Sequence, residues 1–354
     1  MKKVEIVGAG LAGLTAAISL AMEGSEVTVY EKENRIGGIP SARPDPAGSP
    51  FGLSRLAAYT GIDISPVVKP VERGYLMLWG RRYELKIRPG VPLYMVERGS
   101  RASSLDSFLY QNAKKCGVRI QFGQAFETRK DFLDLPPGSI IATGMNKSSF
   151  QALGIPYAIG YAVVAKGKVA HESATVTIYM GEYTINYGFT STINGICYAQ
   201  LFQADIPIGP AAVKDFELDV SHAERFSLSP WKGIDIGVLP FSSYSTPRLF
   251  CGDKILAGTL AGAMDPLMGF GMLGAMLSGK IAALAHSNRE LASREFRRLT
   301  ILYVPELFIR KVMNVSPSWV RRGLARVNVT MADLLPDWLV DLSYRFVPGY
   351  GRMG

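Results

Sequence analysis

The residues best suited to chemistry stand near the start of the chain, where three glycines have a spacing that suits a phosphate-bearing ligand. Gly8, Gly10 and Gly13 follow a short apolar run and open a longer one, which is the GxGxxG pattern. The first glycine permits a tight turn, the second lets the backbone approach a pyrophosphate, and the third lets a helix pack closely on a strand. The N–H groups at the helix start would face the phosphates. That helix start comprises Leu11 and Ala12.

A carboxylate and a second pair of glycines follow this turn. Glu31 closes the next apolar run, where its side chain can accept hydrogen bonds from ribose hydroxyls and would repel a 2′-phosphate. Lys32 comes directly after it, and Arg35, Gly37 and Gly38 complete an ExxxRxGG segment. This segment fits a second contact to the phosphates. A glycine-rich turn without a ligand is the alternative for both glycine groups.

A third glycine-rich stretch lies far away in the sequence, at 258–272. Its residues of interest are Gly258, Thr259, Asp265, Gly269, Gly271 and Met272, the last of which opens an apolar helix. The stretch resembles the GDxxGxxxPxxGxG segment of the flavoprotein group that contains aromatic hydroxylases and geranylgeranyl reductases. The ExxxRxGG segment is similar to one that FAD-binding proteins with two dinucleotide domains carry. The Ser-Gly and Ala-Ala pairs in the following helix resemble the geranylgeranyl reductases in particular.

This resemblance implies an FAD-dependent oxidoreductase that holds its cofactor without a covalent bond. Gly269 and Gly271 would let backbone N–H groups reach the pyrimidine edge of the isoalloxazine ring. The dipole of the helix that follows would stabilise negative charge on the reduced ring. The matches cover residues 4–38, 98–156 and 255–285, so they extend over the cofactor lobe and leave the substrate lobe nearly unmatched.

Two weaker matches support the same resemblance. Arg101 is similar to an arginine that lies near the cofactor in that family, and Arg98 is the competing candidate. The strand end formed by Ala142, Thr143 and Gly144 resembles the point where the family's chain crosses to its substrate lobe.

The sequence also departs from the family pattern. Thr259 stands where the family has an aspartate that holds the ribityl chain, and an uncharged hydroxyl should weaken each hydrogen bond by roughly 1 kcal/mol. Asp265 is a candidate to take over part of that role. The segment 39–43 lacks the family's cysteine, and 187–192 keeps only the aromatic spacing of its YxWxFP segment.

Aromatic residues in the middle of the chain suit an apolar substrate, although they equally suit a packed core. The candidates are Tyr187, Phe189, Tyr198 and Trp231. The resemblance implies hydride transfer from reduced flavin to a C=C bond of an apolar, isoprenoid-type substrate. A flavin-dependent monooxygenase or hydroxylase on the same fold is the alternative, a halogenase less so because no WxWxIP segment is present. A non-catalytic flavin- or lipid-binding protein is a third alternative.

No residue stands out as a catalytic acid, since the three histidines are scattered and none has a recognisable acid partner. No metal-binding pattern is present either. The flavin itself would be the main catalytic group. Because only one dinucleotide-binding pattern is visible, FAD should occupy it, and the electron donor, NAD(P)H or a ferredoxin, would be an external visitor. The sequence does not indicate the oligomeric state.

The elements that must position these residues predict an α/β fold. We expect a Rossmann-like FAD-binding lobe with a parallel sheet, an inserted substrate lobe with a mixed or antiparallel β-sheet, and a helical C-terminus. The first lobe is expected to be discontinuous because its motifs lie far apart. The expected ranges are 1–75, 98–156 and 245–290 for the FAD-binding lobe, 76–97 and 157–244 for the substrate lobe, and 291–354 for the C-terminal helices.

Charge and composition narrow the partners. The 354 residues carry a net charge of +9, which suits anionic partners, but no zinc-finger spacing or dense Lys/Arg run favours nucleic acid. Three widely spaced cysteines fit a reducing cytoplasm. We read no membrane span. The tail from 309 onward mixes basic and aromatic residues, which suits either an amphipathic surface on an anionic membrane or helices packed over the substrate lobe.

Overall fold

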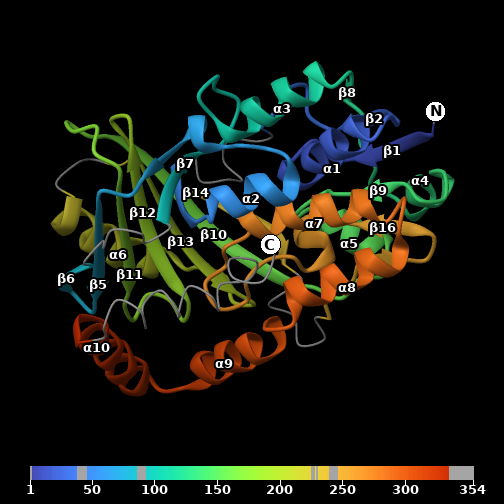
Figure 1. The fold of residues 1–354 in the computed structure, drawn as a ribbon. Coiled ribbons are helices and arrows are strands. Elements are labelled where there is room, and N and C mark those ends of the chain that lie inside the picture. The colour runs from blue at the N-terminus through green and yellow to red at the C-terminus, as the bar shows by residue number, and fades with distance from the viewer. Residues whose placement is uncertain are drawn as a thin grey trace.

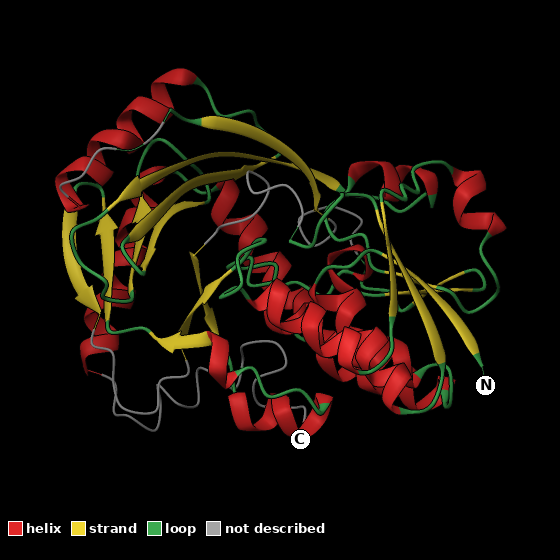
Figure 2. Cartoon of the chain, turned by 90° about the horizontal axis from the view of Figure 1, so that it is seen from above, coloured by secondary structure: helices red, strands yellow, loops and turns green. Residues whose placement is uncertain are grey.

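The chain folds into two lobes, each built around its own large sheet (Figure 1). The computed structural model describes residues 2–37, 46–85, 93–224, 228, 230–238 and 246–334. Gly38 lies outside the described residues. Figure 2 shows the two sheets on opposite sides of a central group of helices.

The first lobe contains a six-stranded sheet in the order β15-β16-β9-β1-β2-β8. Every neighbouring pair is parallel except β15 with β16. The central strands are short and apolar because helices cover both faces of a parallel sheet. The strands are β1 (Lys3–Val7), β2 (Glu26–Glu31), β8 (Arg119–Phe122), β9 (Ile140–Ile141), β15 (Phe250–Cys251) and β16 (Lys254–Leu256).

Two helices from opposite ends of the chain pack against each other in this lobe. They are α1 (Leu11–Met22) and α7 (Met272–Leu284). A Cβ atom on Gly279 would lie 2.3 Å from the carbonyl oxygen of Ala12, so only glycine allows this close approach. Helix α3 (Leu105–Lys115) packs on α1, and α2 (Leu53–Thr60) and the 3-10 turn η4 (Gly258–Ala261) pack on α7. Two short helices, α4 (Arg129–Asp134) and α5 (Lys147–Ala152), contact each other.

The second lobe contains a seven-stranded sheet in the order β14-β10-β13-β12-β11-β5-β6. All neighbours are antiparallel except β11 with β5. The strands are β5 (Arg73–Leu78), β6 (Arg81–Leu85), β10 (Ala158–Lys168), β11 (Thr175–Met180), β12 (Tyr187–Ile193), β13 (Ile196–Ala204) and β14 (Lys232–Val238). Helix α6 (Pro210–Glu224) covers one face, where Phe216 packs against Tyr179. The expected fold class is confirmed.

A small third sheet lies between the lobes. It pairs β7 (Leu93–Glu97) with β3 (Pro46–Pro50) and β4 (Val68–Pro70). The range 76–97 was expected to belong to the substrate lobe as one block. Strands β5 and β6 join the large sheet. Strand β7 instead pairs with β3 and β4, which precede β5 in the sequence, and so belongs to the small sheet.

The last described part of the chain is helical, as expected. It consists of α8 (Arg289–Thr300), α9 (Tyr303–Val315) and α10 (Ser318–Leu334). A short 3-10 turn, η2 (Ser65–Val67), lies far upstream, directly before β4. Helices α9 and α10 run along the lower edge of the molecule in Figure 1. No helix in the described residues is both long and apolar enough to cross a membrane.

Candidate cofactor-binding site

The turn between β1 and α1 is closed by glycines that touch the backbone of a neighbouring strand. Gly8 has φ +102°, and a Cβ atom there would lie 2.5 Å from the carbonyl oxygen of Ala142. A Cβ atom on Gly13 would lie 1.9 Å from the carbonyl oxygen of Gly8. Both contacts are with backbone, which cannot move aside as a flexible side chain can. The sequence therefore fixes a narrow turn at the carboxyl end of β1, a central strand of the parallel sheet.

The amino end of α1 is arranged to receive an anion. Gly10 precedes the helix and provides no side-chain cap, and the first turn holds no acidic residue. Glu31 at the end of β2 accepts a hydrogen bond from the Ala9 N–H at 2.8 Å, so its carboxylate lies beside this turn. Thr143, just past β9, has a buried hydroxyl oxygen with no hydrogen-bond partner. Uncapped N–H groups and a spare hydroxyl are what a bound pyrophosphate would satisfy.

The stretch at 258–261 follows β16 and lies at the same carboxyl end of the strands, although it is far from the first glycine motif in sequence. Gly258 has φ +70°, and its N–H donates to the Ser278 hydroxyl oxygen at 2.9 Å. A Cβ atom on Gly258 would lie 3.2 Å from the Ala12 Cβ atom. Thr259 is half-buried in this turn. The predicted first and third motifs thus meet at the two packed helices, α1 and α7.

The loop ahead of α7 is held by Asp265. Its carboxylate accepts hydrogen bonds from the N–H groups of Leu267 at 2.8 Å and Met268 at 3.0 Å. Gly269 has φ +73°, and Gly271 precedes Met272 without a side-chain cap. We expected Asp265 to take over part of the role of the missing aspartate at 259. Both of its oxygens accept N–H groups of its own loop, and a contact with the ribityl chain stays a prediction.

A second carboxylate, which sequence reasoning missed, lies against Asp265. Glu306 of α9 forms a hydrogen bond with Asp265, and Arg310, one turn later, donates to the Pro266 carbonyl oxygen. Burial and the neighbouring Asp265 carboxylate raise the pKa of Glu306 to about 9. Asp265 accepts two N–H groups and faces the Arg310 cation, so we assign the shared proton to Glu306. Helix α9 thereby clamps the loop at 265–271 from behind.

This clamp predicts a pH dependence that Glu306→Gln should remove. A carboxyl with a raised pKa stabilises the fold fully below its unfolded value of 4.5 and loses that effect as pH rises through about 9. The wild type should therefore lose stability relative to the variant between these values, by at most about 1.4 kcal/mol per pH unit and less with solvent screening. Thermal unfolding across this range measures it. The control Glu290→Gln, at an exposed position on α8, should leave the dependence of stability on pH unchanged. If stability varies with pH in Glu306→Gln as it does in the wild type, the role assigned to Glu306 is refuted.

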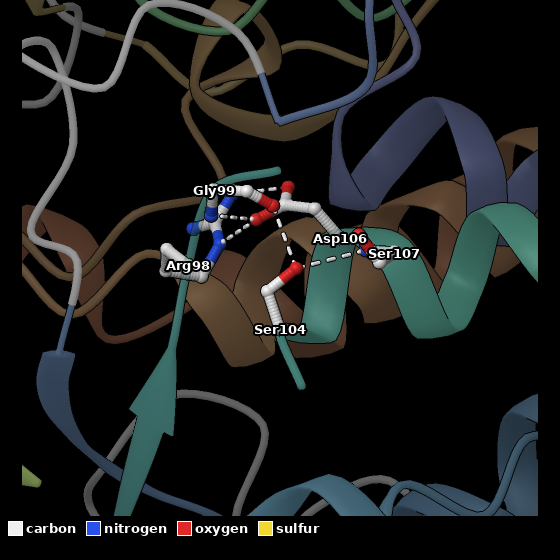
Figure 3. A network of polar contacts seen from close by, with 5 residues as sticks. All are labelled: Arg98, Gly99, Ser104, Asp106 and Ser107. Carbon is white, nitrogen blue, oxygen red and sulfur yellow. Dashed lines mark hydrogen bonds and ion pairs between the residues drawn. The ribbon is translucent and has the colours of Figure 1, made fainter. Parts of the chain in front are cut away.

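The two candidate arginines occupy different environments. Arg98 makes a two-pronged ion pair with Asp106, at 2.8 and 2.9 Å, and the Gly99 N–H also donates to this carboxylate (Figure 3). The Asp106 side chain is fully buried and that of Arg98 is 11% exposed. Ser104 caps α3 through the Ser107 N–H and donates to the Gly99 carbonyl oxygen. Arg98 is therefore bound within the protein.

Arg101 is the better placed of the two for a ligand. Its side chain is 42% exposed and pairs with Glu97. The loop that carries it is fixed next to the second glycine motif, because a Cβ atom on Gly37 would lie 2.3 Å from the Gly99 carbonyl carbon. Lys32 and Arg35 are exposed nearby in sequence, and Lys32 pairs with Glu33 at 3.9 Å. These three cations stay predictions for phosphate contacts.

Three of the four predicted aromatic residues share one face of the large sheet. Tyr187 and Phe189 have ring centroids 6.3 Å apart, and Phe189 stacks on Tyr198 at 6.4 Å. The Tyr187 hydroxyl donates to the Met268 carbonyl oxygen, which joins this face to the loop at 265–271. Trp231 does not belong with them.

Trp231 lies on the opposite face, because it packs against Phe216 of α6 with centroids 5.5 Å apart. Side chains alternate along β12, and Gly188, between Tyr187 and Phe189, faces Phe216. Trp231 is therefore part of the core under α6. Its aromatic character predicted a substrate contact, but sequence alone could not assign it to a sheet face.

The residues present fit an FAD molecule. A glycine turn, an uncapped helix start and the unpartnered Thr143 hydroxyl suit its pyrophosphate, Glu31 suits a ribose, and the uncapped start of α7 suits the flavin ring. Among the described residues, no three His, Cys, Asp or Glu side chains are grouped as metal ligands.

Comparison with known proteins agrees with this geometry. The NAD(P)-binding Rossmann-like domain family matches residues 6–59. Over 47 residues, 12% of this chain, the sequence is 49% identical to the flavin-containing monooxygenase FMO GS-OX-like 7 of Arabidopsis thaliana. That segment spans only 10% of the monooxygenase.

Two solved structures extend the likeness over nearly the whole chain. A geranylgeranyl bacteriochlorophyll reductase-like protein from Thermoplasma acidophilum has a TM-score of 0.69 at 14% identity, over 92% of this chain and 91% of that one. The oxygenase of 2-methyl-3-hydroxypyridine-5-carboxylic acid has a TM-score of 0.60 at 14% identity, over 91% and 96%. The expected resemblance is confirmed for the fold. Residues 6–59 thus match an NAD(P)-binding Rossmann-like domain, and the fold of the chain is similar to those of a reductase-like protein and an oxygenase.

Proposed function

We propose that this protein is an FAD-dependent oxidoreductase that reduces a C=C bond of an apolar, isoprenoid-type substrate. The observation that carries the proposal is the aromatic face of the large sheet, which meets the loop at 265–271 through the hydrogen bond from Tyr187 to Met268. That loop leads into α7 and presents Gly269 and Gly271, the positions suited to a flavin ring. FAD, when bound, would supply the hydride.

The protein's own residues would hold and orient the reactants. The half-buried Phe189 offers flat apolar surface to an unsaturated chain, and the fully buried Tyr198 stacks against it and holds its ring in place, which corrects the expectation that Tyr198 itself contacts the substrate. Burial raises the pKa of Tyr187 to about 12, so its phenol keeps its proton and its hydrogen bond to the loop. The electron donor would be NAD(P)H or a ferredoxin acting from outside this site.

Reoxidation of the reduced flavin tests the proposal. The FAD-loaded protein is reduced without oxygen and mixed with a polyprenyl lipid, and the flavin absorbance is followed. We expect the lipid to reoxidise the flavin and to gain two hydrogens, as measured by mass spectrometry. No anaerobic reaction, together with NAD(P)H consumption that needs oxygen and an aromatic compound, would instead show a monooxygenase. If the protein takes up no FAD, the result would favour the non-catalytic lipid-binding alternative.

A further inference from the structure

The exposed apolar side chains of this protein are concentrated on two helices. Of the thirteen large hydrophobic side chains that are exposed among the described residues, nine lie between 301 and 327. Six of these side chains on α9 and α10 form what we call the outer strip: Val304, Phe308, Val312, Val315, Trp319 and Val327. We propose that the outer strip docks on the surface of an anionic lipid bilayer. This proposal does not depend on the reaction proposed above.

The spacing on α9 shows a true two-faced helix. Val304, Phe308, Val312 and Val315 follow each other at intervals of three or four residues, so they lie on one side. Val315 is 84% exposed and Phe308 68%. The opposite side carries Tyr303, Glu306 and Arg310, which face the protein. The helix is therefore fixed from within while its apolar side faces out.

Helix α10 is fixed in the same way by its basic residues. Arg321 donates to the Thr184 carbonyl oxygen at 3.2 Å, and Arg322 pairs with Glu182 at 3.2 Å. Arg322 also lies over the Trp79 ring, 5.3 Å from its centroid. Trp319 remains 75% exposed on the outer side. An exposed tryptophan beside basic side chains is the composition of helices that lie in the interface of a membrane.

Charge decides between a bilayer and a second copy of the chain. Apart from the inward-facing Glu306 and Arg310, the segment 303–334 holds four cations, Lys311, Arg321, Arg322 and Arg326, and one acidic residue, Asp333. A symmetric dimer through the outer strip would bring this positive charge against itself. An anionic bilayer would attract the same charge while its acyl region receives the apolar side chains. The protein's net charge of +9 acts in the same direction.

Cosedimentation with vesicles tests the proposal on the full chain. The vesicles contain phosphatidylglycerol and phosphatidylcholine in equal parts, or phosphatidylcholine alone, at physiological ionic strength of about 0.15 M. We expect binding to the anionic vesicles and at least about tenfold weaker binding to the neutral ones. Phe308→Ser with Trp319→Ser should lower binding to the anionic vesicles at least about tenfold.

The matched control replaces two equally apolar, exposed residues elsewhere. Leu133→Ser with Ile206→Ser changes side chains that are 63% and 52% exposed on α4 and after β13, and binding should stay unchanged. Lys311→Gln with Arg326→Gln should weaken binding to anionic vesicles and leave the weak binding to neutral vesicles as it is. Should the serine variant fail to fold, quenching of Trp319 fluorescence by brominated lipid, absent in Trp319→Phe, measures the same contact.

Two results would overturn the proposal. One is the absence of wild-type binding to anionic vesicles. The other is a wild-type dimer in sedimentation velocity that the outer-strip variant converts to a monomer, without any vesicle binding, because the strip would then join two copies of this chain.

Discussion

Replacing Gly13 with alanine should lower the affinity for FAD by at least about a hundredfold, or roughly 2.7 kcal/mol. The added Cβ atom would lie 1.9 Å from the carbonyl oxygen of Gly8, and therefore α1 must move away from the turn that it closes. That movement displaces the uncapped N–H groups at the helix start. The measurement is an FAD titration by fluorescence, together with the visible spectrum of the purified protein.

A control glycine separates this effect from the general cost of altering a glycine. Gly323 lies in α10, and a Cβ atom there would meet nothing within 4 Å. Gly323→Ala should keep the wild-type FAD affinity. If Gly13→Ala also binds FAD normally, the turn at 8–13 is not the pyrophosphate site.

Removing Arg98 should destabilise the whole fold, by about 3–5 kcal/mol, because a fully buried Asp106 carboxylate would lose its cation. The Gly99 N–H remains as a partner but cannot neutralise the charge. Urea unfolding of Arg98→Ala against the wild type measures the loss. The close contact between Gly99 and Gly37 should loosen as well, because the Gly99 N–H is bound to the same Asp106 carboxylate.

The neighbouring arginine provides the contrast. Arg101 is 42% exposed but its partner Glu97 is buried, so Arg101→Ala should also cost stability. The loss should be smaller than for Arg98→Ala, because solvent reaches the Arg101 position and the Ser103 hydroxyl still donates to Glu97. If its guanidinium contacts a phosphate, FAD affinity should fall about tenfold. Equal stability losses in the two variants would contradict the different roles assigned to them.

The parts of the fold that the sequence predicted are those with strong local signals. The helix predicted to start at Leu11 is α1, and the one predicted to start at Met272 is α7, because glycines followed by an apolar run mark both starts. The candidate cofactor site could be proposed from sequence for the same reason, because each glycine imposes a local requirement on the backbone. Thr143 was assigned from resemblance, and its unpartnered hydroxyl supports that place.

The features that sequence could not predict depend on contacts between distant segments. Glu306 and Arg310 are ordinary residues of an amphipathic helix until α9 packs behind the loop at 265–271. In the sequence Trp231 cannot be distinguished from the other candidate aromatic residues, because only the folded sheet shows which face each side chain occupies. From the sequence, the region of the outer strip showed only a mixture of basic and aromatic residues, because the side of α9 that faces the protein was unknown. Spacing within one helix could have indicated the strip, but no local signal indicates the pair of Asp265 and Glu306.

The pairing of β16 with β9 bears on how this protein is made. Ile255 lies beside Ile140, which lies beside Ile6, and α7 must then pack on α1 before the lobe is complete. A ribosome adding about 5–20 residues per second would therefore release the first two strands and their helix long before their partners exist. The nascent chain must wait with an open sheet edge and an exposed apolar helix, a condition that favours chaperone capture. FAD can stabilise only the finished chain, so the cofactor would act as a late check on folding rather than as an early nucleus.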